Sequence, residues 1–115
     1  ILSGYENRCC MTGISHPSLL IASHIVPWAS DENNRLNPAN GLCLSALHDK
    51  AFDKGLITVT PDLIIRVSQK LRDTENSPMA QMYLLGLDGK LITPPHKLAP
   101  NPDFLNYHST KIFLG

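Results

Sequence analysis

NGLCLSALHDKAFDKGLITV, residues 40 to 59, contains a short apolar strand, a helix and the start of another strand in direct succession. Ser45 is suited to cap the N-terminus of the helix, and Gly55 is suited to end it just past the last helical residue. At about 100° of rotation per residue, His48 falls on the apolar arc of this helix. The other members of that arc are Leu44, Leu47, Ala51 and Phe52. We therefore predict a short helix whose buried face includes an ionisable ring.

The charged residues of the same helix lie on its other side. Asp49 and Asp53 point away from the apolar arc, and Lys50 and Lys54 follow further round. These charges make the helix amphipathic without His48. The His48 ring therefore needs a polar partner of its own wherever it lies.

The stretch before this helix predicts a strand and a long loop. SLLIASHIVPW, residues 18 to 28, has the Leu, Ile and Val content of a strand, and the polar stretch from 29 to 40 is typical of a surface loop. A strand-loop-strand ribbon packed under the helix would bring His24 and His48 face to face. Asn40, at the end of the loop, would then share one cleft with the two imidazoles.

The rest of the chain predicts peripheral elements and an α+β fold. Residues 56 to 68 indicate two strands around the turn at Pro61 and Asp62, and Ser77 followed by Pro78 indicates the start of a helix. A terminal helix is expected within 101 to 113, with its aromatic residues packed back on the domain. We treat residues 1–115 as a single domain.

Composition sets limits on the class of protein. The 115 residues are 43% hydrophobic and 17% charged, which fits one compact domain with a modest core. The formal net charge is zero, so there is no general electrostatic attraction to nucleic acid or membranes. No apolar run is long enough to span a bilayer. We expect a soluble cytoplasmic protein with reduced cysteines. Because the first residue is Ile1, we also expect a domain excised from a longer chain.

Each candidate residue also has a structural interpretation. A single histidine on an apolar strand or helix is more often a core ring bonded to a backbone carbonyl than a catalytic group. Asn40 followed by Gly41 is first of all a turn. The combination of His24, Asn40 and His48 on strand, loop and helix favours chemistry over structure.

Three motifs, SHIVPW, NGLCL and LHDKAFDKGL, together resemble the HNH endonuclease family, also called His-Me finger or ββα-metal nucleases. The run from RCCMTG through HIVPW to NGLCLSALHDKAFDKGLITV is similar to HNH domains at the C-terminus of predicted bacterial restriction endonucleases. The resemblance implies a ββα-metal core over about residues 9–55, with an additional hairpin and peripheral C-terminal helices.

The resemblance also implies a function, a metal-dependent DNA endonuclease that serves as the catalytic domain of a restriction or DNA-defence enzyme. His24 matches the general base, Asn40 the asparagine that holds the loop and helps to orient that base, and His48 the ligand of one divalent cation. Imidazole can accept a proton from water near neutral pH. Mg²⁺ is the first choice of metal, with Mn²⁺, Ni²⁺ and Zn²⁺ as alternatives.

The sequence departs from the family at two metal positions. Ser23 stands where many members have an acidic ligand. Asp49 or Asp53, or the DNA phosphate and waters, could take the place of that ligand, or nothing does. His48 and Asp53 point about 140° apart on a helix, which favours Asp49 as the second ligand and Asp53 as a tie at the helix end. The cysteines that would hold a structural zinc are incomplete, so Cys9, Cys10 and Cys43 are interpreted as buried thiols, with no structural zinc.

For DNA contacts we expect Arg35, Lys50 and Lys54, and for the substrate double-stranded DNA. A homodimer and an N-terminal domain of the same protein are the expected sources of specificity. The alternative is a catalytically inactive HNH scaffold that binds nucleic acid or serves a structural role, and Ser23 is the feature that favours it. A zinc-binding protein without nuclease activity is a third interpretation.

Overall fold

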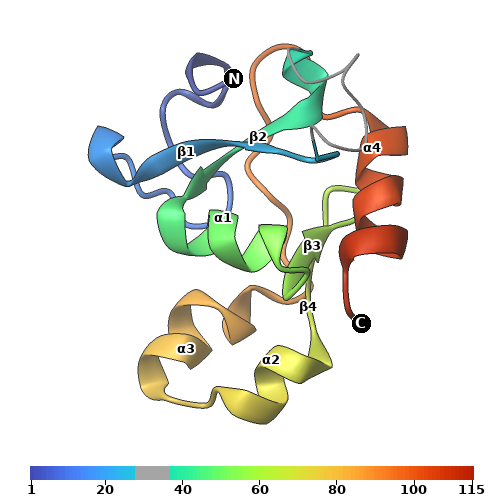
Figure 1. The fold of residues 1–115 in the computed structure, drawn as a ribbon. Coiled ribbons are helices and arrows are strands. Elements are labelled where there is room, and N and C mark those ends of the chain that lie inside the picture. Colours follow the sequence, from blue (N-terminus) through green and yellow to red (C-terminus); the bar gives the residue numbers. More distant parts are fainter. Residues whose placement is uncertain (28–36) are drawn as a thin grey trace.

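The computed structural model describes residues 1–27 and 37–115, and its first half is a strand-strand-helix unit. Strand β1 (Leu20–His24) pairs antiparallel with β2 (Gly41–Ser45), in a register that runs from Leu20 opposite Ser45 to His24 opposite Gly41. Helix α1 (Ala46–Asp53) follows β2 directly and packs against this ribbon (Figure 1). All residues of β2 are buried, which explains its continuous apolar run. The predicted order of two strands and a helix is confirmed, and most of the predicted loop between the strands lies outside the described residues.

Both predicted ends of α1 are confirmed. The Ser45 hydroxyl accepts the backbone N–H of His48 at 3.3 Å, and Gly55 follows the helix with a φ of +74°. A Cβ atom on Gly55 would lie 2.2 Å from the backbone oxygen of Ile112, so the C-terminal segment also requires a glycine there. Leu47 is the exception to the predicted buried arc, because 56% of its surface is exposed.

A second small sheet follows α1. Strands β3 (Ile57–Val59) and β4 (Ile65–Val67) form the predicted antiparallel hairpin around Pro61 and Asp62. Leu91 adds a single antiparallel bridge to Ile64, next to β4. The β3 strand is fully buried and joins the core formed by β2 and α1.

Short helices surround the two sheets. They are α2 (Gln69–Thr74), α3 (Pro78–Tyr83) and α4 (Pro102–Tyr107), together with 3₁₀ turns at Ser3–Tyr5, Pro17–Leu19, Pro38–Asn40 and Leu85–Leu87 and a π-helical turn at His108–Ile112. Helices α2 and α3 form the lower end of the molecule (Figure 1), and the π-helical turn that follows α4 contacts β3. Helix α2 was not expected from the sequence. In the part of the chain that the structure describes, no helix combines the length and the apolarity needed to cross a membrane.

The C-terminal segment is attached to α1 through a buried histidine. Nε2 of His108 donates to the backbone carbonyl of Phe52 at 2.8 Å, and Nδ1 accepts the hydroxyl of Thr58 at 2.7 Å. The ring stacks on Phe52 with 3.6 Å between centroids. Burial lowers the pKa of His108 to about 4, against the opposing effects of the Phe52 hydrogen bond and the charge of Asp53.

This buried ring predicts a stability that falls at acidic pH. Well above pH 6.5, the ordinary pKa of histidine, the His108 ring is neutral in both the folded and the unfolded chain. As the pH falls from there to about 4, the unfolded chain takes up a proton that the folded protein resists, so the free energy of unfolding decreases.

Urea denaturation at a series of pH values would measure this effect in the wild type and in His108→Gln. The glutamine amide can still donate to the Phe52 carbonyl but does not titrate. We expect the variant to be less stable at neutral pH, because the ring stacking is lost, and to show a shallower dependence between pH 6.5 and about 4. If the free energy of unfolding depends on pH equally in the two proteins, His108 is not the cause of the loss of stability at acidic pH.

Candidate active site

His24 lines a pocket between β1 and α1. The pocket has a volume of about 320 Å³, and its walls are formed by Ile21, Ala22, Ser23, His24, Pro27, Asp49 and Asp53. His24 ends β1, and both carboxylates come from α1. His24 and Asp49 are half-buried, whereas Asp53 is exposed. The site therefore combines one imidazole with two carboxylates at a solvent-accessible surface.

Helix geometry explains why both carboxylates reach this pocket. Asp49 and Asp53 are four residues apart, so they lie on the same face of α1, one turn after the other. Asp53 was predicted to point away from His48 and to tie down the end of the helix. The structure instead places Asp53 beside Asp49 in the His24 pocket. The signal that could have found it is the spacing of four residues between the two aspartates.

His48 lies on the buried face of α1, as predicted, but does not share the pocket of His24. It lines a different pocket of about 500 Å³, together with Ser45, Tyr83 and Leu84 among other residues. Only 1% of its surface is exposed. The expected face-to-face arrangement of His24 and His48 is therefore wrong, because the two side chains line different pockets.

Both ring nitrogens of His48 are bonded within the chain. Nε2 is 2.7 Å from the backbone oxygen of Tyr83, and Nδ1 is 2.6 Å from the hydroxyl oxygen of Ser45. A carbonyl can only accept, so Nε2 carries the proton and the lone pair of Nδ1 accepts the Ser45 hydroxyl. Burial lowers the pKa of His48, which favours this neutral form. The lone pair that a metal would need is already in use.

Asn40 bonds the chain just before β2 to the chain just after β1. Its side-chain oxygen accepts the N–H of Val26 at 2.8 Å, its side-chain nitrogen donates to the Val26 carbonyl at 3.1 Å, and its backbone oxygen accepts the N–H of Ile25 at 3.0 Å. Asn40 is fully buried. It thus fixes Ile25 and Val26, the two residues that follow His24.

Residues 9–60 match the family model described as HNH endonuclease. The resemblance to the HNH family is confirmed. The matched segment, called the HNH segment below, is a little under half of the chain. It includes His24, Asn40, His48 and both pocket aspartates. No curated protein matches the chain.

HNH nucleases generally use a divalent metal, and the chemistry of the pocket fits such an ion. Within residues 1–27 and 37–115, no group of three or more His, Cys, Asp or Glu side chains is arranged to hold a metal on its own. A complete protein cage is not needed for Mg²⁺, which usually binds through one or two carboxylates, water and substrate phosphates. Asp49 and Asp53 offer that kind of ligand beside His24.

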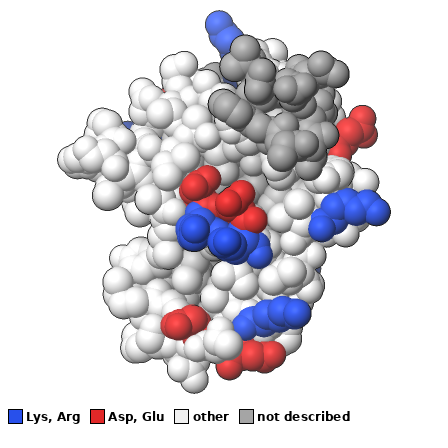
Figure 2. Space-filling view, viewed as in Figure 1, with Lys and Arg blue, Asp and Glu red and all other residues white. Residues whose placement is uncertain are grey.

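The charged surface over α1 in the HNH segment has both signs. Figure 2 shows acidic and basic side chains next to each other on this face. Lys50 and Lys54 are exposed and follow the two aspartates in sequence, which is compatible with contacts to phosphates beside the pocket. Arg35, the third expected DNA contact, lies outside the described residues.

The cysteines of the HNH segment are buried and unpaired. Cys9, Cys10 and Cys43 are at most 3% exposed, which confirms their predicted burial. Burial is the largest of the effects that raise the pKa of Cys43 to about 11, and it also raises the pKa of Cys10. At neutral pH these two groups are therefore protonated thiols.

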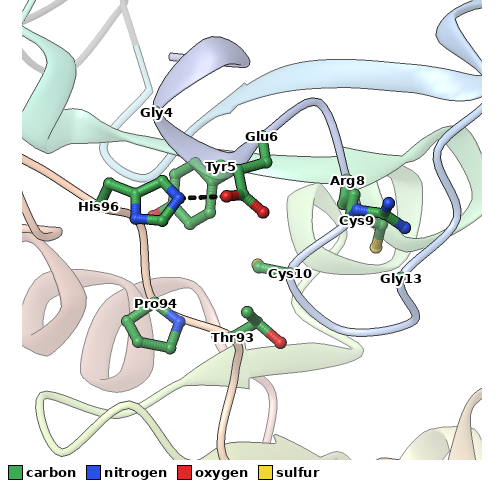
Figure 3. A pocket seen from close by; sticks show the side chains of 10 residues that line it. All are labelled: Gly4, Tyr5, Glu6, Arg8, Cys9, Cys10, Gly13, Thr93, Pro94 and His96. Atoms are coloured by element: carbon green, nitrogen blue, oxygen red, sulfur yellow. Dashed lines mark hydrogen bonds and ion pairs between the residues drawn. The ribbon is translucent and has the colours of Figure 1, made fainter.

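Cys9 and Cys10 line a small pocket of about 120 Å³ between residues 4–13 and residues 93–96. Within it Glu6 and His96 point toward one another as an exposed ion pair (Figure 3). The hydrogen bond from His96 is the main cause that lowers the pKa of Glu6. This pair ties the two segments together.

Proposed function

We propose that this protein is a metal-dependent DNA endonuclease and the catalytic part of a restriction or DNA-defence enzyme. The observation that carries the proposal is one pocket, within the segment that matches the HNH family, lined by His24, Asp49 and Asp53. The family supports nuclease chemistry on DNA. The pocket adds the residue types that phosphodiester hydrolysis needs, a base and ligands for a cation.

In the proposed reaction, His24 accepts a proton from the attacking water. The water oxygen forms a bond to phosphorus while the bond from phosphorus to the 3′ oxygen breaks, and the 3′ oxygen gains a proton from solvent. Asn40 keeps the end of β1 in place through its bonds to Ile25 and Val26. A divalent cation, when bound, would stabilise the negative charge that develops on the phosphate.

We assign the cation to Asp49, with Asp53 as a second carboxylate, in place of His48. Asp49 was already a candidate ligand in the sequence, and it is the half-buried carboxylate of the pocket. We propose Mg²⁺ as the ion, because oxygen ligands are the type it prefers. Lys50 and Lys54 then contact flanking phosphates of double-stranded DNA. Specificity and double-strand cutting are assigned to a homodimer and to an N-terminal domain.

The second candidate function is a catalytically inactive HNH scaffold. It is favoured by Ser23, which lines the pocket at the place where many family members have an acidic ligand. Nicking of DNA by the purified protein would exclude this candidate.

Nicking of supercoiled plasmid is the test of the proposed activity. We expect nicking with Mg²⁺ or Mn²⁺ and none with EDTA. Asp49→Asn should slow the reaction by about 10²-fold, because it removes a charge that holds the cation next to the phosphate.

Asp103→Asn is the matched control for this experiment. Asp103 is an exposed aspartate in the first turn of a different helix, α4, so its replacement should leave nicking unchanged. Equal activity of the Asp49→Asn variant and the wild type would exclude our assignment of the cation to Asp49. Absence of nicking by the wild type with either metal would contradict the proposed function.

A further inference from the structure

His48 connects three elements of the fold although it belongs to only one of them. Its ring is attached through Nδ1 to Ser45, the last residue of β2, and through Nε2 to the carbonyl of Tyr83, the last residue of α3. The ring itself stands on the first turn of α1. Each of the two bonds is short and buried at the histidine end, so together they fix the position of the ring.

The bond to Ser45 also forms part of the helix cap. The Ser45 oxygen accepts the backbone N–H of His48 while its hydroxyl proton is donated to Nδ1 of the same residue. Ser45 is itself held by β-pairing with Leu20. The backbone and the side chain of His48 are therefore attached to the same fixed point, which restricts rotation of the first helical turn.

The bond to Tyr83 attaches that turn to α3. Carbonyls in the last turn of a helix have no partner within the helix, and His48 supplies one for Tyr83. No residue of α3 lines the His24 pocket. The bond from His48 is thus a contact through which α3 restrains the helix that carries the aspartates.

Asp49 directly follows His48, so the two side chains are about 100° apart around the same helical turn. A rotation of this turn that moved the His48 ring would move the Asp49 carboxylate with it. His48 is 1% exposed, and its ring makes two hydrogen bonds on the inner side of the helix. Asp49 borders the His24 pocket on the outer side.

We propose that His48 is a positioning residue that, through Ser45 and the Tyr83 carbonyl, holds the first turn of α1 so that Asp49 faces the His24 pocket. This inference rests on the proposed function, because Asp49 is its metal ligand. It assigns to His48 a role that acts through Asp49, in place of direct contact with the cation.

The test compares His48→Gln and Ser45→Ala with two matched controls. Leu47→Gln places the same side chain on the neighbouring, exposed position of α1, and Ser68→Ala removes a serine that caps α2 without contacting an imidazole. Circular dichroism would establish the temperature range in which every variant is folded, and all measurements would be made within that range.

Two readouts follow, the Mn²⁺ concentration for half-maximal nicking and the Mn²⁺ dissociation constant by calorimetry. We expect His48→Gln and Ser45→Ala each to raise both values by about tenfold, as loss of a group that orients a ligand does, with little change in the KM for plasmid. The double variant should be no worse than the worse single variant, because the two groups act as a unit. The controls should match the wild type.

NMR of the imidazole nitrogens separates positioning from direct coordination. On saturation with Mg²⁺ the Nδ1 signal of His48 should stay unchanged, as expected for a nitrogen that keeps its bond to Ser45. A shift of this signal typical of metal coordination would overturn the inference, and so would folded variants with unchanged Mn²⁺ affinity.

Failure of the proposed function gives a different pattern. A wild-type protein that binds Mn²⁺ without nicking would contradict the nuclease proposal, and the calorimetric comparison of the variants would still support or overturn the role of His48. A wild-type protein that binds no Mn²⁺ would overturn both the nuclease proposal and the proposed role of His48.

Discussion

Replacement of His24 by alanine is expected to slow metal-dependent nicking by about 10²- to 10⁴-fold, the usual contribution of a general base. The physical reason is that no other imidazole lines the pocket between β1 and α1 in the described part of the chain. The remaining carboxylates, Asp49 and Asp53, are assigned to the cation. The measurement is the single-turnover rate of plasmid nicking at saturating Mn²⁺.

Two comparisons make this result specific to the base. His16→Ala removes an exposed histidine that also belongs to the HNH segment but does not line the pocket, so its rate should equal that of the wild type. Added imidazole should restore part of the activity of His24→Ala, because the half-buried ring leaves a space that is open to solvent. An unchanged rate in His24→Ala would exclude the proposed role of His24.

The part of the fold that could be predicted is the part determined by local pattern. The alternation of apolar and polar residues, Ser45 before the helix and Gly55 after it define α1 without reference to any other element. Helix α2 was missed because its six residues, QKLRDT, contain one buried apolar residue, Leu71, and no amphipathic period can be recognised over such a length.

The residues that form the site could not be predicted from local sequence pattern alone. A helical wheel correctly gives the angle between His48 and Asp53, but it does not say which neighbouring element each side chain faces. His48 meets the carbonyl of Tyr83, 35 residues further along the chain, and a backbone carbonyl leaves no trace in the sequence. The resemblance to the HNH family led to the choice of His48 as metal ligand, whereas the packing of α1 favours Asp49.

Asn40 is the residue whose loss should cost the most stability in the site. Asn40→Ala would leave the N–H and the carbonyl of Val26 without their partners at a fully buried position. Each unsatisfied buried group costs about 1–3 kcal/mol, so we expect the free energy of unfolding to fall by about 2–4 kcal/mol. Chemical denaturation monitored by circular dichroism would measure this loss, and a change below about 1 kcal/mol would contradict the assigned hydrogen bonds.

Asn40→Asp tests the same bonds with almost no change in shape. The ionised carboxylate can still accept the N–H of Val26, but it cannot donate to the Val26 carbonyl and it places a charge in a fully buried position. We therefore expect it to be at least as destabilising as alanine at neutral pH. When the acid is protonated it regains a donor, so its disadvantage relative to the wild type should shrink as the pH is lowered. A disadvantage that does not depend on pH would show that the Val26 carbonyl does not need the amide of Asn40. Because Ile25 and Val26 follow His24, we also expect Asn40→Asp to slow nicking at temperatures where the variant is folded, since the bonds of Asn40 help to position the base.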